Sequence, residues 1–159
     1  MIRAVIKEEL PVCLEVIHRS FQTVADEFGL TKENCPTNGA FMPVERLMDD
    51  YEKGMRMFAL FHEGEMAGYM QLEQKGGDVV KLEKLAVLPQ YRHLGFGKEL
   101  LDFAKGKAKE LGAGKLTLGM IDENTRLKNW YLANGFVSIE TKVIPNLPFT
   151  VGYMECPLG

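Results

Sequence analysis

The stretch from Val79 to Leu111 constrains the fold more than any other part of the chain. Its first residues are rich in valine and leucine and predict a buried strand over Val79–Leu88. A basic turn with two glycines follows at Pro89–Gly97, and apolar residues at helical spacing then predict an amphipathic helix over Gly97–Leu111. This arrangement gathers main-chain N–H groups at the positive end of a helix dipole. The sequence therefore predicts an anion site, suited to phosphate, at the turn.

Two common phosphate-binding motifs do not fit this turn. A Walker loop has a Lys-Ser/Thr pair after its last glycine, whereas Gly97 is followed by Lys98 and Glu99. A dinucleotide-binding fingerprint has a third glycine or an alanine where Leu100 stands. Both motifs are therefore disfavoured.

The turn and a downstream segment together resemble a different family. An R-x-x-G-x-G motif over residues 92–97, preceded by L-x-V-x-P over 85–89, is similar to the acyl-CoA signature of the GNAT superfamily of N-acetyltransferases. Residues 124–136 resemble the second signature of that family, an Asn, then a Tyr, then Gly-Phe. The resemblance implies that the pyrophosphate of coenzyme A lies on the turn. The cofactor-binding residues that follow from it are Leu85, Ala86, Val87, Arg92, His93, Leu94, Gly95, Phe96, Gly97, Lys98 and Asn124.

The order of predicted elements fits the fold of the same family, although periodicity alone specifies only an α/β or α+β protein. The resemblance implies one domain over residues 1–159, with a mixed, mostly antiparallel twisted sheet of about seven strands and four helices on both faces. It also implies that the sheet opens between Val79–Leu88 and Lys115–Met120, where the pantetheine arm would lie. The other predicted strands are Met1–Lys7, Met55–His62, Met66–Gln74, Phe136–Ile144 and Phe149–Cys156, and the other helices are Glu8–Phe28, Pro43–Lys53 and Asn124–Asn134.

Charge and composition limit the classes of partner. A net charge of −3 argues against nucleic acid and is compatible with a cationic amine. No apolar run approaches the roughly 18 residues of a membrane span, and the start has no signal-peptide core, so we expect a cytoplasmic protein. The three cysteines have no metal-site spacing, and neither a zinc site nor another catalytic metal is expected.

Attack of an amine on a thioester needs a neutral amine and stabilisation of the oxyanion. Glu83 is the candidate base, because it lies on the central strand next to the expected thioester position. If no bulge intervenes, its side chain shares a face with Leu85 and Val87. The alternative is a structural Glu83 paired with Lys81 or Lys84. For the oxyanion, we expect main-chain N–H groups near residues 86 and 87, where a bulge would free one from the sheet.

The leaving thiolate needs a proton donor. The resemblance implies that the hydroxyl of Tyr131 points at the thioester sulfur, and a phenol with a pKa of about 10 is protonated at pH 7. The alternative is that Tyr131 packs in the core with Trp130 and Leu127. Asn124, besides contacting the cofactor, is a favourable helix N-cap.

The resemblance therefore implies an acyl-CoA-dependent N-acetyltransferase that moves an acetyl group from acetyl-CoA to a primary amine by direct attack, through a tetrahedral intermediate. The alternatives are a non-catalytic acyl-CoA-binding or regulatory module, and an enzyme that acetylates protein lysines or N-termini. We expect a small-molecule amine, selected by the first two helices and by the loops Leu30–Met42 and Pro145–Pro148. The sequence does not identify this amine, and a homodimer through the C-terminal strands would be common among relatives.

Overall fold

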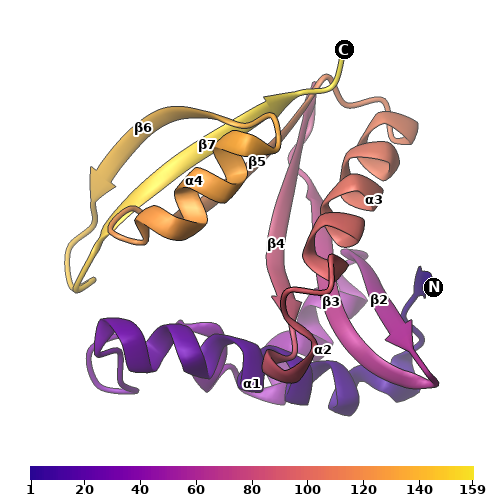
Figure 1. Ribbon diagram of the computed structural model, residues 1–159, viewed down its shortest axis with the longest axis horizontal. Helices are drawn as coiled ribbons and strands as arrows, with labels where there is room; N and C mark the ends of the chain where they lie inside the picture. Colours follow the sequence, from indigo (N-terminus) through magenta and orange to yellow (C-terminus); the bar gives the residue numbers. More distant parts are fainter.

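The computed structural model describes residues 1–159 and has one seven-stranded sheet in the order β1-β2-β3-β4-β5-β7-β6 (Figure 1). All neighbouring strands are antiparallel except β4 and β5, which are parallel. The strands are β1 Ile2–Ala4, β2 Arg56–His62, β3 Glu65–Gln74, β4 Val79–Val87, β5 Lys115–Ile121, β6 Val137–Val143 and β7 Thr150–Pro157. The helices are α1 Leu10–Phe28, α2 Val44–Glu52, α3 Phe96–Glu110 and α4 Thr125–Ala133, with 3₁₀ turns at Lys7–Glu9, Gly39–Phe41 and Pro89–Tyr91.

The four helices cover both faces of the sheet. Buried residues of α1 and α2, such as Ile17 and Leu47, form one core with the face of β2 and β3 that these helices cover. Buried residues of α3, such as Leu100 and Ala104, share a second core with Tyr131 of α4 and the opposite side of the sheet. The predicted fold, a mostly antiparallel sheet with four helices on two faces, is confirmed.

Most differences from the predicted boundaries lie at the ends of elements. The first strand is shorter than Met1–Lys7, because the chain turns after Ala4 and forms a 3₁₀ turn before α1. Glu9 fixes this turn, since its carboxylate accepts the Ile6 N–H at 3.0 Å and pairs with Arg3 at 2.6 Å. Helix α3 begins at Phe96, one residue earlier than predicted.

The sheet opens between β4 and β5, as the family resemblance implied. The two strands pair only at their first residues, from Val79 opposite Lys115 to Lys81 opposite Thr117. Beyond this point β4 stays with β3, while β5 continues beside β7 and α4 (Figure 1). The open edge of β4 and the inner edge of β5 thus face each other without hydrogen bonds between them.

A bulge interrupts β4 beside this opening. The pairing with β3 shifts between Tyr69, opposite Ala86, and Gln71, opposite Glu83, so that two residues of β4 stand against one of β3. Lys84 is at the bulge with a φ of 55°, a left-handed conformation that few lysines adopt. The bulge therefore falls earlier in the strand than the predicted position at residues 86 and 87.

Candidate active site

A cavity of about 320 Å³ lies where β4 and β5 separate. Residues 81–85 of β4 form one wall and residues 118–121 of β5 the other. Asn124, Leu127 and Tyr131 line it from α4 and the turn before it. Helix α1, the two loops that were expected to select the acceptor and the start of β7 complete it, with Phe21, Val24, Cys35, Thr37, Asn38, Gly39, Leu147, Phe149 and Val151. The cavity thus brings both predicted catalytic side chains, Glu83 and Tyr131, to one place.

Tyr131 is held rigidly but keeps its hydroxyl available. The residue is only 6% exposed, and its ring packs against Trp130 and Phe136 at centroid distances of 5.1 and 5.3 Å. Its hydroxyl has no protein hydrogen-bond partner, and no fully buried polar side-chain atom lacks a partner, so the hydroxyl is accessible from the cavity. Burial raises the pKa of Tyr131 above its ordinary value, because the phenolate would lose solvation. Core packing and an available proton donor are therefore combined in one residue.

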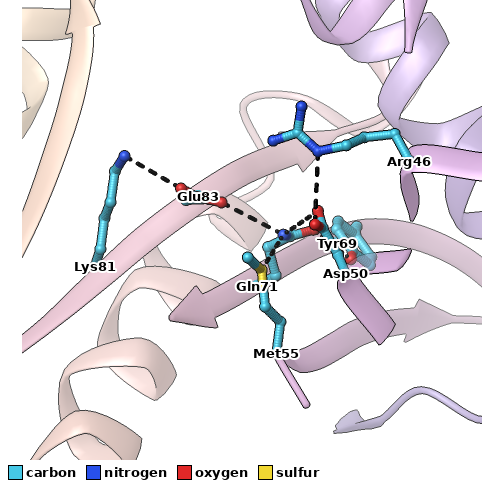
Figure 2. A network of polar contacts seen from close by, with 7 residues as sticks. All are labelled: Arg46, Asp50, Met55, Tyr69, Gln71, Lys81 and Glu83. Atoms are coloured by element: carbon cyan, nitrogen blue, oxygen red, sulfur yellow. Dashed lines mark hydrogen bonds and ion pairs between the residues drawn. The ribbon is translucent and has the colours of Figure 1, made fainter. Parts of the chain in front are cut away.

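Glu83 lines the cavity and belongs to a polar network that reaches Asp50 of α2 (Figure 2). Its Oε1 pairs with Lys81 Nζ at 3.2 Å, and its Oε2 accepts a long hydrogen bond of 3.5 Å from Gln71 Nε2. Gln71 is fully buried and also donates to Asp50 Oδ2 at 3.1 Å, while its Oε1 accepts from the hydroxyl of Tyr69 at 2.8 Å. Both the candidate base and the structural alternative, a pair with Lys81, are thus compatible with the position of Glu83.

The bulge changes which β4 residues share a face. Leu85 and Val87 pack toward the α3 core, whereas Ala86 lies in the α1 core with Tyr69, whose hydroxyl joins the network of Glu83. The expectation that Glu83 shares a face with Leu85 and Val87 applied only to a strand without a bulge, and β4 has a bulge between them. Glu83 nevertheless lines the cavity together with Leu85.

Asn124 caps the N-terminus of α4. Its Oδ1 accepts the main-chain N–H of Leu127 at 3.2 Å, as expected for an N-cap. The residue also lines the cavity, so the capping role leaves its side chain beside the space where the predicted cofactor contact would form.

The turn before α3 presents a run of unpaired main-chain donors. The six N–H groups from His93 to Lys98 make no hydrogen bond to a protein acceptor, whereas Arg92 and Glu99 on either side do. His93 and Gly95 have φ values of 66° and 86°, and alternation of left-handed residues curls a chain so that successive N–H groups converge. Unpaired main-chain donors at the N-terminus of the 15-residue α3 are the arrangement that the sequence predicts for an anion site.

The two basic side chains of this turn, Arg92 and Lys98, already have protein partners. Arg92 is directed to α1, where it donates to Thr23 Oγ1 at 2.9 Å and to the Ser20 carbonyl at 3.0 Å. Burial lowers the pKa of Arg92 from its ordinary value. Lys98 pairs with Asp102 at 2.9 Å, and the side chains of His93 and Leu94 are exposed. The unpaired donors of this turn are therefore its main-chain N–H groups, whereas Arg92 and Lys98 are already paired.

Sequence reasoning missed the buried network that Glu83 joins through Gln71, and the position of Lys84. Gln71 and Asp50 come from β3 and α2, and no local pattern connects them with β4. Lys84 lines the cavity because the bulge turns the chain there, and the bulge depends on the register with β3. No three His, Cys, Asp or Glu side chains are grouped as metal ligands, and none of the helices has the length and apolarity of a membrane span.

Comparison with known proteins places the chain in a family. The model of the acetyltransferase (GNAT) family matches residues 25–136. An uncharacterised N-acetyltransferase in the pepI 3′ region of Lactobacillus delbrueckii subsp. lactis is 29% identical over 150 residues, which cover 86% of this chain and 84% of that protein. An uncharacterised N-acetyltransferase of Staphylococcus aureus is 30% identical over 107 residues, or 61% of this chain and 68% of that protein.

Solved structures have the same fold. The ribosomal-protein-S18-alanine N-acetyltransferase of Escherichia coli superposes with a TM-score of 0.79 at 19% identity, covering 100% of this chain and 94% of that one. The PaiA N-acetyltransferase of Thermoplasma acidophilum, solved in complex with coenzyme A, gives a TM-score of 0.75 at 18% identity, covering 99% and 98%. The chain belongs to the acetyltransferase (GNAT) family, and the predicted family and enzyme class are confirmed.

Proposed function

We propose that this protein transfers an acetyl group from acetyl-CoA to a primary amine. The observation that carries the proposal is the pairing of two features on one β4–α3 unit. Six unpaired main-chain donors gather at residues 93–98, and the strand that leads to them lines a cavity containing Tyr131. The coenzyme A complex of the Thermoplasma acidophilum neighbour and an acetyl-CoA complex from Elizabethkingia anophelis, a neighbour with a TM-score of 0.72, support the choice of cofactor.

The turn fits the pyrophosphate of coenzyme A on chemical grounds. Main-chain N–H groups at a helix N-terminus bind phosphate oxygens without needing a basic side chain. Residues 93–98 would hold this group, and Asn124 and Leu85 would flank the remainder of the cofactor in the cavity. When bound, acetyl-CoA supplies an acetyl thioester, an activated acyl group that an amine attacks directly.

Glu83 would take the proton of the attacking amine. An aliphatic ammonium with a pKa near 10.4 is almost entirely protonated at neutral pH, and only the neutral amine is a nucleophile. The Glu83 carboxylate lines the cavity with a side chain 16% exposed, so it can accept this proton directly or through a water molecule. Its ion pair with Lys81 at 3.2 Å positions the carboxylate at the wall of the cavity.

A main-chain group of β4 would stabilise the oxyanion. N–H groups alternate in direction along a strand, and the Leu88 N–H donates to the Ala67 carbonyl of β3 at 2.8 Å. The N–H of Val87 is therefore directed to the other side, where β5 has left the sheet. A donor already aligned there stabilises developing negative charge without reorganisation of the protein.

Tyr131 would stabilise the leaving thiolate. Because burial raises its pKa, the hydroxyl keeps its proton throughout the physiological range. The same shift makes complete proton transfer to a thiolate, with a pKa of about 8.5, less favourable than the unperturbed values suggest. We therefore assign Tyr131 the role of a hydrogen-bond donor to the sulfur as the carbon–sulfur bond breaks.

Replacing Tyr131 with Phe tests this proposal. The change keeps the ring between Trp130 and Phe136 and removes only the hydroxyl. We expect kcat to fall by about 10²- to 10³-fold, the range for removing one donor to developing negative charge, with little change in the affinity for acetyl-CoA. Thiol release from acetyl-CoA, screened against amines, amino acids, polyamines and aminoglycosides, measures the rate. Wild-type turnover in this variant would contradict the role of Tyr131, and no thiol release with any amine would contradict the transfer itself.

A further inference from the structure

Lys84 occupies an unusual place in the cavity. It lies at the bulge of β4, in a left-handed conformation with a φ of 55°, and it lines the cavity beside Lys81 and Glu83. These three are the only charged residues in a lining that is otherwise neutral and largely apolar. Since a glycine or asparagine adopts this backbone conformation at lower cost, a lysine there invites a chemical explanation.

The charges around Lys84 do not balance. Both carboxylates near it already have cationic partners: Asp50 pairs with Arg46 at 3.5 Å, and Glu83 pairs with Lys81 at 3.2 Å (Figure 2). Gln71 donates to both carboxylates as well. Lys84 makes no ion pair and no side-chain hydrogen bond with any protein group, its ammonium is not fully buried, and the residue is part of the cavity lining. The region therefore holds three cations against two anions, and Lys84 is the cation without a partner.

An unpartnered ammonium in such surroundings favours an incoming anion. Burial lowers the pKa of Lys84, while the negative charge of Glu83 acts in the opposite direction, so the protonated lysine is incompletely stabilised. A carboxylate brought beside it would restore a charge-assisted hydrogen bond, which is about twice as strong as a neutral one. A second ammonium brought to the same place would be repelled by Lys84, Lys81 and Arg46.

We propose that Lys84 binds a carboxylate of the acceptor, so that the protein acetylates amines that also carry a carboxylate and an apolar group. A free α-amino acid with an apolar side chain and a short peptide with such a residue both have this chemistry. The inference rests on the proposed acetyl transfer and adds the class of its acceptor. It narrows the cationic amine with which the net charge is compatible to one that also carries a carboxylate. The apolar group would contact Phe21, Val24, Leu118, Met120, Phe149 and Val151.

Calorimetric titration of the coenzyme A-bound protein tests the inference without requiring turnover. The titrants are leucine, phenylalanine and methionine, each beside its amide, which keeps the amine and the side chain but lacks the carboxylate. We expect at least one amino acid to bind about 10- to 100-fold more tightly than its amide, the range for a hydrogen bond to a charged group. The Lys84→Met variant should lose this preference and the Lys84→Arg variant should regain part of it. Lys75→Met, on the distant β3–β4 turn, should leave it unchanged.

The outcomes separate this inference from the proposed function. Equal affinities for every amino acid and its amide, no binding of any amino acid, or a preference that persists in Lys84→Met would overturn the carboxylate site. A preference for the carboxylate that depends on Lys84, observed without acetyl transfer, would support the carboxylate site and overturn the proposed transfer. Acetyl transfer to amides as fast as to amino acids would support the proposed transfer and overturn the carboxylate site at Lys84. Leucylglycine distinguishes the two sources: binding equal to leucine indicates peptide acceptors, and weaker binding indicates free amino acids.

Discussion

At the scale of single residues, the contacts of Glu83 fit two different roles, one structural and one catalytic. Lys81 and Gln71 bind its two oxygens, as they would in a structural network, yet the side chain also lines the cavity opposite Tyr131. Sequence reasoning selected Tyr131 and Asn124 by their places in a motif and Glu83 by its place on the central strand, and all three line the cavity. It did not find Gln71, Asp50 or the exposure of Lys84 to the cavity, since these depend on contacts between segments far apart in the chain.

Replacing Glu83 with Gln distinguishes its two roles. Glutamine keeps the size and one hydrogen-bond acceptor but cannot take a proton from the amine. If Glu83 is the base, kcat/KM should fall by about 10²- to 10⁴-fold while the unfolding midpoint changes little. Asp50→Asn is the matched control, because Asp50 belongs to the same network but does not line the cavity. Its effect should appear in urea unfolding rather than in rate. Unchanged turnover in Glu83→Gln would leave Glu83 a purely structural residue.

At the scale of elements, the turn into α3 was the most predictable part of the site and the bulge in β4 the least. The turn is specified locally by its glycines and by the helix that follows, and its predicted limits differ from the structure by a single residue. The bulge is set by how β4 aligns with β3, so the sequence predicted it too late in the strand. The predicted face of Glu83 depended on the same register. Local patterns predict an element, whereas the register between strands depends on the whole sheet.

Two glycines of this unit allow a paired test. Gly95 has a φ of 86° at the N-cap of α3, so Gly95→Ala strains the turn although a methyl group there would meet no other atom. We expect a loss of about 1 kcal/mol in stability and a weaker affinity for coenzyme A, because the N–H groups no longer converge. Gly106→Ala, in the middle of the same helix and also without a clash, should instead stabilise by about 0.5–1 kcal/mol and leave the affinity unchanged. Equal coenzyme A affinity in both variants would exclude the turn as the pyrophosphate site.

At the scale of the whole molecule, two buried tyrosines predict how stability responds to alkaline pH. Burial raises the pKa of Tyr131 and that of Tyr69, and the nearby charges of Asp50 and Glu83 add to the shift at Tyr69. In the unfolded chain both phenols have the ordinary tyrosine pKa of 10.0. The two protonated phenols therefore contribute fully to the free energy of unfolding below pH 10. This contribution is lost as the pH rises toward their pKa values in the folded protein, by about 1.4 kcal/mol per pH unit for each tyrosine. Urea unfolding above pH 10 should show a shallower loss for Tyr131→Phe than for wild type, and parallel losses would contradict the shift.

The overall fold was predictable because the order of helices and strands agrees with one family arrangement along nearly the whole chain. The opening between β4 and β5 followed from that resemblance, whereas the lining of the cavity did not, since it comes from segments as distant as Phe21 and Val151. We expect this lining to select the acceptor. The balance of charges around Lys84 depends on contacts among α2, β3 and β4, which no local sequence pattern predicts.

A crystal structure of the protein with coenzyme A tests the central claim most directly. The account predicts that the pyrophosphate oxygens accept hydrogen bonds from the main-chain N–H groups of residues 93–98. It also predicts that the thiol sulfur lies within hydrogen-bonding reach of the Tyr131 hydroxyl, in the cavity between β4 and β5. A pyrophosphate bound away from this turn, or a sulfur remote from Tyr131, would contradict it.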